Sequence, residues 1–252
     1  LLCPVCVTLG KTLPDQFNNK DVRGWIILSD DMNAAIQTIK AAKEYDINQL
    51  QLSHEIIHDL REIKNEKVCA QVNELVNLAH SEGINEVLLW DHSLYNIDYY
   101  PERFRTGPGG TIDLDNPEFW EWLKDDYRQM LDRVSEADGL VLTFIETGAY
   151  AERQFSKKMK SSEEKLAAVV NAISDVLIGE RKKKLYIRTF AYSEEEYKGT
   201  TGCIEYLKYD EVILMMKETP HDFFLTHPDN YYIQKMDRPV IVEFDLGNEY
   251  SG

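Results

Sequence analysis

Three acidic residues follow predicted strands at points far apart in the chain. Glu146 follows the apolar run LVLTFI, Asp222 follows VILMMKETPH, and Glu249 follows VIVEFDLGN. Cleavage of a glycosidic bond needs two carboxyl groups, one to protonate the leaving oxygen and one to activate water or attack. Because active sites of parallel α/β folds lie at the C-terminal ends of strands, we expect these acids to gather around a sugar. The alternative is that each acid caps a helix.

Two cationic residues lie in apolar, strand-like runs: Arg188 in LYIRTF and Lys217 at the end of VILMMK. A cation inside a barrel needs an anionic partner, because burying a lone charge is costly. That partner is either a neighbouring acid or the carboxylate of a substrate, which arginine can bind bidentately. In the second case Arg188 and Lys217 bind a substrate that carries a carboxylate.

Other side chains at strand ends are candidates for contact with a sugar. The candidates are His54, Trp90, Asp91 and Tyr150. Aromatic rings offer flat apolar faces for stacking, although such residues more often belong to a core. The alternative for His54 is a hydrogen-bonded core histidine. The long polar loop after Trp90, residues 92–115, contributes further aromatics, and we expect these to be contacts because the loop has little core to join.

The segment His54-Glu55-Ile56-Ile57-His58 has the HExxH spacing of zinc peptidases. On a helix this spacing places two imidazoles on one face, with Glu55 as the base. The preceding NQLQLS alternates like a strand, however, so it provides no helix for the motif. A zinc peptidase is therefore the alternative enzyme class.

Composition restricts the classes of function. The chain has 252 residues, a formal net charge of −16 and 43% hydrophobic residues, which suits one acidic globular domain. Such a charge disfavours nucleic acid and anionic membrane surfaces as partners. No apolar run approaches the roughly 20 residues that span a membrane.

Apolar runs and helical patterns alternate along the chain. Strands are predicted at 22–30, 49–53, 84–90, 139–145, 184–190, 212–216 and 240–244. Helices are predicted at 32–45, 65–81, from 115 onward, 161–177 and 194–206, with a capping pattern at Ser161. This alternation predicts a TIM-like (β/α)8 barrel with seven recognisable strands and the eighth missing. We expect an irregular segment over 1–20 and a barrel domain over 21–252, incomplete at its C-terminus.

The opening segment LLCPVCVTLGKTLPDQF has two interpretations: the end of a signal peptide, or what remains after the loss of an upstream segment. We expect a periplasmic or secreted location rather than a cytoplasmic one. Cys3 and Cys6 form a single CPVC, and a structural zinc site needs a second pair of ligands.

Several segments resemble the catalytic barrel of the glycoside hydrolase family 67 α-glucuronidases, in the same order. VILMMKETPHDFFLTHP is similar to the family's stretch with Lys, then Pro, then Asp-Phe, and VEFDLGNEYSG resembles its strand ending in Gln-Glu-Tyr-x-Gly. LYIRTFAY resembles the strand that supplies the substrate-binding arginine, and LVLTFIETGAYAERQF takes the place of the general-acid strand. The resemblance implies that Glu146 is the acid and that Asp222 and Glu249 are the bases. It also implies that Arg188 and Lys217 hold a uronate.

The predicted function is an exo-acting, inverting α-glucuronidase-like hydrolase, with Glu146 partly buried. It removes a uronic acid or similar sugar from oligosaccharides derived from polysaccharides such as xylan. Leu142 stands where the family carries a lysine, which leaves uronate specificity open. No metal or cofactor is expected, and a homodimer is left open. A non-catalytic glycan-binding barrel is the remaining alternative, because the eighth strand is missing.

Overall fold

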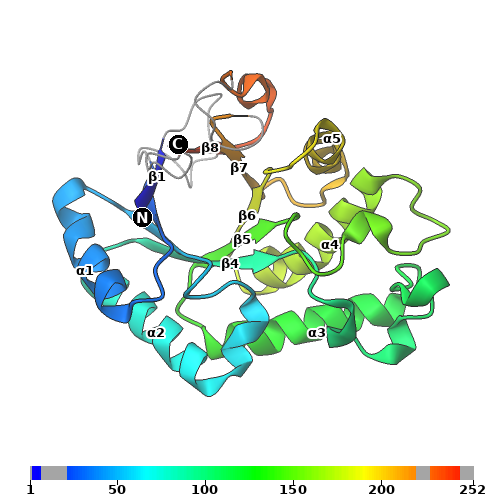
Figure 1. Cartoon of the computed structure of the whole chain (residues 1–252), viewed down its shortest axis with the longest axis horizontal. Coiled ribbons are helices and arrows are strands. Elements are labelled where there is room, and N and C mark those ends of the chain that lie inside the picture. Colours follow the sequence, from blue (N-terminus) through cyan, green and yellow to red (C-terminus); the bar gives the residue numbers. More distant parts are fainter. Residues whose placement is uncertain (1, 7–21, 220–227, 245–252) are drawn as a thin grey trace.

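Seven parallel strands curl into a barrel in the computed structural model, which describes residues 2–6, 22–219 and 228–244. The strands are β2 (Arg23–Ile27), β3 (Gln49–Leu52), β4 (Glu86–His92), β5 (Gly139–Thr143), β6 (Lys184–Arg188), β7 (Ile213–Lys217) and β8 (Val240–Glu243). They pair in chain order, each with the next (Figure 1). The predicted α/β barrel with seven recognisable parallel strands is therefore confirmed.

The eighth strand of the barrel is β1 (Leu2–Cys6), which pairs antiparallel with β2 and with β8. It closes the sheet at the place where a further parallel strand would lie in a TIM barrel. Figure 1 shows β1 beside β8. The prediction of an irregular segment over 1–20 is thus wrong for these five residues. The short run LCPVC gives no alternating pattern that would identify it as a strand.

Five α-helices lie on the outer side of the curled sheet, around β2 to β6 (Figure 1). They are α1 (Met32–Ala42), α2 (Glu66–Ser81), α3 (Pro117–Arg133), α4 (Ser162–Ser174) and α5 (Glu194–Gly202). Each starts after a polar residue whose side chain accepts a hydrogen bond from a backbone N–H of the first turn: Asp31, Asn65, Asn116, Ser161 and Ser193. The predicted cap at Ser161 is a full capping box with Glu164.

Short helical turns lengthen these helices or cross the loops. The 3-10 turns are η2 (Lys43–Tyr45), η3 (Leu60–Lys64), η4 (Ile97–Tyr99), η5 (Glu102–Phe104), η6 (Pro108–Gly110), η7 (Ala151–Arg153), η9 (Cys203–Tyr206) and η10 (Tyr231–Lys235). A π-helical segment, η8 (Asp175–Glu180), continues α4. The predicted helices at 161–177 and 194–206 therefore each consist of an α-helix followed by a turn of different pitch.

Side chains of each strand alternate between the barrel interior and the helices. The interior cluster consists of Ile26, Leu88, Trp90, Val141, Tyr186, Ile213, Met215 and Ile241. On β4, Val87 and Leu89 belong instead to the core under the helices. By the same alternation, His92 points inward at the end of β4 and Asp91 points outward.

A network of hydrogen bonds runs through the barrel interior from β3 and β4 to β6. The Glu86 carboxylate accepts hydrogen bonds from Gln49 Nε2 at 2.9 Å and from the Tyr186 hydroxyl at 2.6 Å. Gln51 donates to Gln49 at 3.0 Å, and the Trp90 indole N–H donates to Gln51 at 3.0 Å. Burial of these groups is tolerated because each is hydrogen-bonded. This hydrogen-bond network fixes the position of the Trp90 indole just below the C-terminal end of the barrel.

Asp91 is fully buried on the helix side of β4. Its carboxylate accepts hydrogen bonds from the Leu60 N–H at 2.9 Å, the Tyr95 hydroxyl at 2.8 Å and the Tyr127 hydroxyl at 2.6 Å. Burial raises the pKa of Asp91 to about 6 despite these bonds. Asp91 therefore ties η3, the loop after β4 and α3 to the sheet, and the prediction that it contacts substrate finds no support in this placement.

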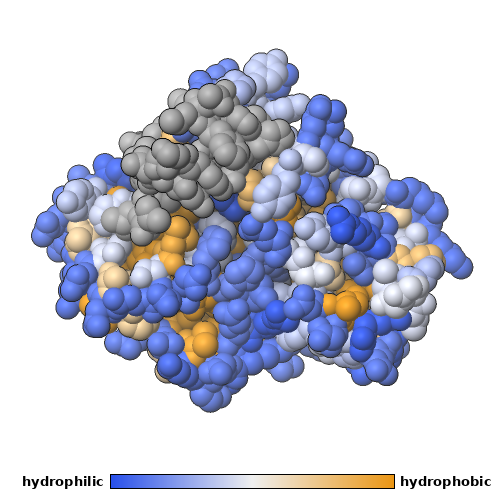
Figure 2. Space-filling view, in the orientation of Figure 1, coloured by the Kyte–Doolittle hydropathy of each residue, from blue (hydrophilic) through white to orange (hydrophobic). Residues whose placement is uncertain are grey.

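Hydrophilic side chains cover most of the face shown in Figure 2, and apolar side chains form small separate patches. Among the described residues, no helix combines the length and the hydrophobicity that a membrane crossing requires.

Replacing Asp91 tests its role as an anchor. Asp91→Ala leaves three buried donors without their acceptor, so we expect the free energy of unfolding to fall by about 3–5 kcal/mol. Asp91→Asn keeps an oxygen for Leu60 and Tyr95, and should cost only about 1 kcal/mol. Urea denaturation followed by circular dichroism measures both. Equal stability of the alanine variant and the wild type would contradict this role.

Candidate functional site

The C-terminal ends of the strands bring several of the predicted site residues together at the mouth of the barrel. The rings of His54 and Trp90 lie 5.0 Å apart, and the Arg188 guanidinium lies 4.8 Å from the Trp90 ring centre. The Lys217 ammonium lies 3.5 Å from the ring centre of Phe190, which also contacts Arg188 at 4.8 Å. Four predicted residues, contributed by four different strand ends, therefore converge.

Arg188 forms a bidentate ion pair with Glu243 inside the mouth. Its Nε and Nη2 atoms donate to the two Glu243 oxygens at 2.7 and 2.6 Å, and the two side chains are 7% and 3% exposed. Of the two partners considered for Arg188, the structure thus provides the neighbouring acid. Burial favours the neutral acid, but the charges of Arg188 and Lys217 prevail, and the pKa of Glu243 is lowered.

Glu243 is the residue of this site that sequence reasoning missed. A signal for it exists, because Glu243 lies two positions after the inward-facing Ile241. Strand alternation therefore turns it into the barrel. In the register of the sheet it is the direct neighbour of Lys217 on β7.

Glu146 lies just after β5 in a left-handed backbone conformation, with φ of 58°. Its side chain is exposed, whereas partial burial was predicted. The Tyr192 hydroxyl donates a hydrogen bond to Glu146 at 2.5 Å, and Tyr192 is itself 59% exposed. Left-handed residues other than glycine are strained and occur often at functional sites. Among the described residues, this pair gives the mouth an exposed carboxyl and an exposed aromatic ring.

His54 is partly buried at the end of β3 and also has a positive φ, 47°. Its Nδ1 atom lies 2.5 Å from the Ser53 hydroxyl. Burial, and then the charge of Arg188, lower the pKa of His54 to about 4, so its imidazole is neutral at neutral pH. A neutral imidazole can both donate and accept hydrogen bonds.

The HExxH segment is not helical: residues 53–59 form turns and bends between β3 and η3. The His54 and His58 rings stand 6.1 Å apart at an angle of 82°. The zinc-peptidase alternative needs both imidazoles on one helical face, so the structure does not support it. His58 instead stacks on His92 at 4.2 Å. The two rings meet at Asp59, and these three side chains are the described residues that could hold a metal ion.

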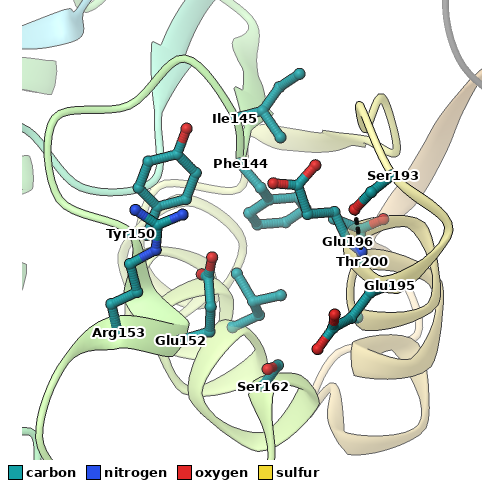
Figure 3. A pocket seen from close by; sticks show the side chains of 12 residues that line it. Phe144, Ile145, Tyr150, Glu152, Arg153, Ser162, Ser193, Glu195, Glu196 and Thr200 are labelled. Atoms are coloured by element: carbon teal, nitrogen blue, oxygen red, sulfur yellow. Dashed lines mark hydrogen bonds between the residues drawn. The ribbon is translucent and has the colours of Figure 1, made fainter.

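Tyr150 lines a separate cavity of about 240 Å³ between the segment after β5 and the start of α5 (Figure 3). The Arg153 guanidinium lies 4.1 Å from the Tyr150 ring centre. Burial raises the pKa of Glu152 in the same cavity, and Glu195 and Glu196 line its other side. The cavity is thus acidic and partly aromatic.

The remaining predicted site residues fall outside the mouth or outside the described part of the chain. Asp222 and Glu249 lie outside the described residues. The loop aromatics Tyr95, Tyr100 and Phe104 are buried under the helices, so the expectation that they contact substrate is wrong. Trp90 belongs to the mouth but is itself buried, and its ring packs against His54 and Arg188.

Comparisons with known proteins support the fold alone. No protein-family model matches the chain, and no curated protein sequence matches it. A variant of NCR from Zymomonas mobilis is 14% identical with a TM-score of 0.51, over 85% of this chain and 68% of that structure. CpGH84B is 14% identical with a TM-score of 0.49, over 78% of this chain. A Thermobaculum terrenum O-GlcNAc hydrolase mutant is 10% identical with a TM-score of 0.49, over 77% of this chain.

The chain spans only 33% of the length of CpGH84B and 39% of that of the O-GlcNAc hydrolase. At these identities, the likeness to the NCR variant concerns the arrangement of strands and helices. Membership of glycoside hydrolase family 67 therefore stays a prediction from the segments that resemble it.

The contribution of the Arg188–Glu243 ion pair to stability can be tested by replacing one partner alone and then both partners together. Glu243→Ala leaves a buried cation without its carboxylate, so we expect the free energy of unfolding to fall by about 3–5 kcal/mol. The double variant Arg188→Met, Glu243→Leu removes both charges and should recover most of this loss. Urea denaturation at neutral pH measures the three proteins. A double variant no more stable than Glu243→Ala would contradict the assignment.

The same ion pair predicts that the stability of the protein depends on pH. Because folding lowers the pKa of Glu243 below its usual value of 4.5, the pair contributes fully above that value. Its contribution disappears as the pH falls through the lowered pKa. The stability of the wild type relative to the double variant should therefore decrease on acidification below about 4.5.

Proposed function

We propose that this protein is a glycoside hydrolase whose reaction takes place at the barrel mouth. The observation that carries the proposal is the exposed Glu146 carboxyl, held by Tyr192 at 2.5 Å and placed at the C-terminal end of β5. This end of a barrel is where such enzymes hold their reacting groups. The exposed Tyr192 ring offers a flat surface for a sugar, and the neutral His54 offers hydrogen bonds to its hydroxyl groups.

In this proposal Glu146 protonates the oxygen of the leaving sugar. Asp222, Glu249 or both deprotonate a water molecule that attacks from the opposite side of the ring, which inverts the anomeric centre. Such a mechanism needs roughly 6.5–9.5 Å between the acid and the base. Glu243 is not assigned the role of base, because its carboxylate is buried against Arg188.

The finer proposal is an exo-acting α-glucuronidase-like enzyme that releases a uronic acid from xylan-derived or similar oligosaccharides. It is supported by the segments that resemble family 67 and by the two cations at the mouth. In this proposal Arg188 and Lys217 together attract the carboxylate of the sugar, since both charges lie at the mouth beside Glu243.

Substitution of Glu146 tests its role as the acid. Glu146→Gln should lower kcat by about 100- to 10,000-fold on a natural oligosaccharide, whose leaving group needs a proton. With a 2,4-dinitrophenyl uronoside, whose leaving group needs none, the loss should stay below about tenfold. Glu74→Gln, an exposed glutamate of α2, is the matched control and should keep full activity.

An equal loss on both substrates would contradict the role of Glu146 in proton donation. A wild-type protein that binds glucuronate in calorimetry and turns over neither substrate would instead be a glycan-binding barrel. The anomer released first, seen by proton NMR, distinguishes inversion from retention.

Substitution of Lys217 tests the preference for a uronate. A charged hydrogen bond contributes about 1.5–3 kcal/mol, so Lys217→Met should weaken glucuronate binding by about 10- to 100-fold and leave glucose binding within about twofold. Calorimetry with the two sugars measures the difference. Lys208→Met, a lysine paired with Asp175 on the outer surface, is the control. Equal weakening for both sugars would show that Lys217 does not recognise the carboxylate.

A further inference from the structure

Two imidazoles and a carboxylate meet beside the mouth, at the ends of β3 and β4. His58 and Asp59 lie in the turn between β3 and η3, and His92 is the last residue of β4. The two strands are neighbours in the sheet, so their ends lie next to each other. Sequence reasoning considered His58 as part of the HExxH segment or as a single histidine at a strand end, and so missed its grouping with Asp59 and His92.

The distances within the group suit a shared ion. Asp59 Oδ1 lies 2.9 Å from His92 Nδ1 and 3.4 Å from His58 Nδ1. One ligand atom from each residue lies within 4.8 Å of the others. A tetrahedral ion with bonds of about 2.0–2.2 Å keeps its ligand atoms about 3.3–3.6 Å apart. The 3.4 Å separation lies within that range, and the 2.9 Å separation is a hydrogen bond that the ion replaces.

The surroundings orient the carboxylate. Arg61 donates to Asp59 Oδ2 at 2.9 Å, which leaves Oδ1 directed at the two imidazoles. Partners of this kind, outside the ligands themselves, commonly orient the ligands of metal sites. The side chains of Asp59 and His92 are 8% and 4% exposed, whereas that of His58 is 42% exposed. The group is therefore closed on the protein side and open toward solvent at His58.

We propose that His58, Asp59 and His92 bind one divalent cation of the zinc class. Two imidazoles and one carboxylate suit zinc and its transition-metal neighbours, whereas magnesium and calcium prefer oxygen ligands alone. On binding, the imidazole nitrogens that take the ion lose any proton they carry to solvent. The fourth position, on the open side, takes water or a ligand oxygen. The ion ties the turn after β3 to the end of β4.

This inference goes beyond the proposed function, which uses no metal, and the two can fail independently. It also differs from the HExxH alternative, because neither His54 nor Glu55 is a ligand. His54 lies against Trp90 at 5.0 Å, with its Nδ1 atom engaged by Ser53.

The test is the binding of Zn²⁺ alone to protein first treated with a chelator. We expect one equivalent of zinc by elemental analysis after dialysis, and a single binding event in calorimetry. His58→Ala and Asp59→Asn should each weaken the affinity by at least about tenfold. His80→Ala is the matched control, because His80 forms the same kind of pair with Asp138 at 2.9 Å on the outer surface. It should bind zinc as the wild type does.

Two further measurements distinguish the proposed site from zinc binding by cysteines or by other surface groups. The double variant Cys3→Ser, Cys6→Ser should bind zinc unchanged, and Co²⁺-loaded protein should lack a thiolate charge-transfer band, since the proposed ligands are nitrogen and oxygen. Zinc should also raise the Tm of the wild type and not that of His58→Ala. Absence of stoichiometric zinc, or full zinc affinity in His58→Ala, would overturn the proposal. So would loss of binding in the cysteine variant.

Discussion

The buried ion pair of Arg188 and Glu243 is the interaction on which the barrel mouth depends. It joins β6 to β8 across β7, and removal of two charges from water is repaid only by close, bidentate geometry such as the 2.6 and 2.7 Å contacts seen here. The position of the guanidinium fixes its neighbours in turn. Trp90 and Phe190 each contact it at 4.8 Å. Its charge also helps to keep His54 neutral, so one pair determines both packing and protonation at the mouth.

Most of the fold was predictable because its signals are local. Continuous apolar runs identify the seven parallel strands, and polar caps such as Ser161 mark where helices begin. The antiparallel strand β1 was not predictable on this basis. Leu2–Cys6 is short, contains a proline and has no alternating pattern. Its pairing follows from the gap that seven parallel strands leave between β8 and β2, which is a property of the closed sheet rather than of the segment.

The site was predictable in part, and the errors over Asp91 and Glu243 share one cause. The rule that function lies at C-terminal strand ends correctly brings His54, Arg188 and Lys217 together. It does not say which side of the sheet a residue faces. Trp90 faces the interior, so Asp91, one residue later, must face the helices. Glu243 was missed for the same reason, since only strand parity distinguishes it from an outward residue.

The order of the strands places different kinds of side chain on different sides of the barrel mouth. Imidazoles lie on the side of β3 and β4, cations lie on the side of β6 and β7, and Glu146 follows β5 between them. A protonated His54 would place a second positive charge next to Arg188 in a poorly solvated place; burial and then this repulsion lower its pKa, so the imidazole is neutral. His58 lies farther along the turn, where the hydrogen bond to Asp59 raises its pKa. The exposed Glu146 carboxyl therefore lies between the imidazoles after β3 and β4 and the cations of β6 and β7.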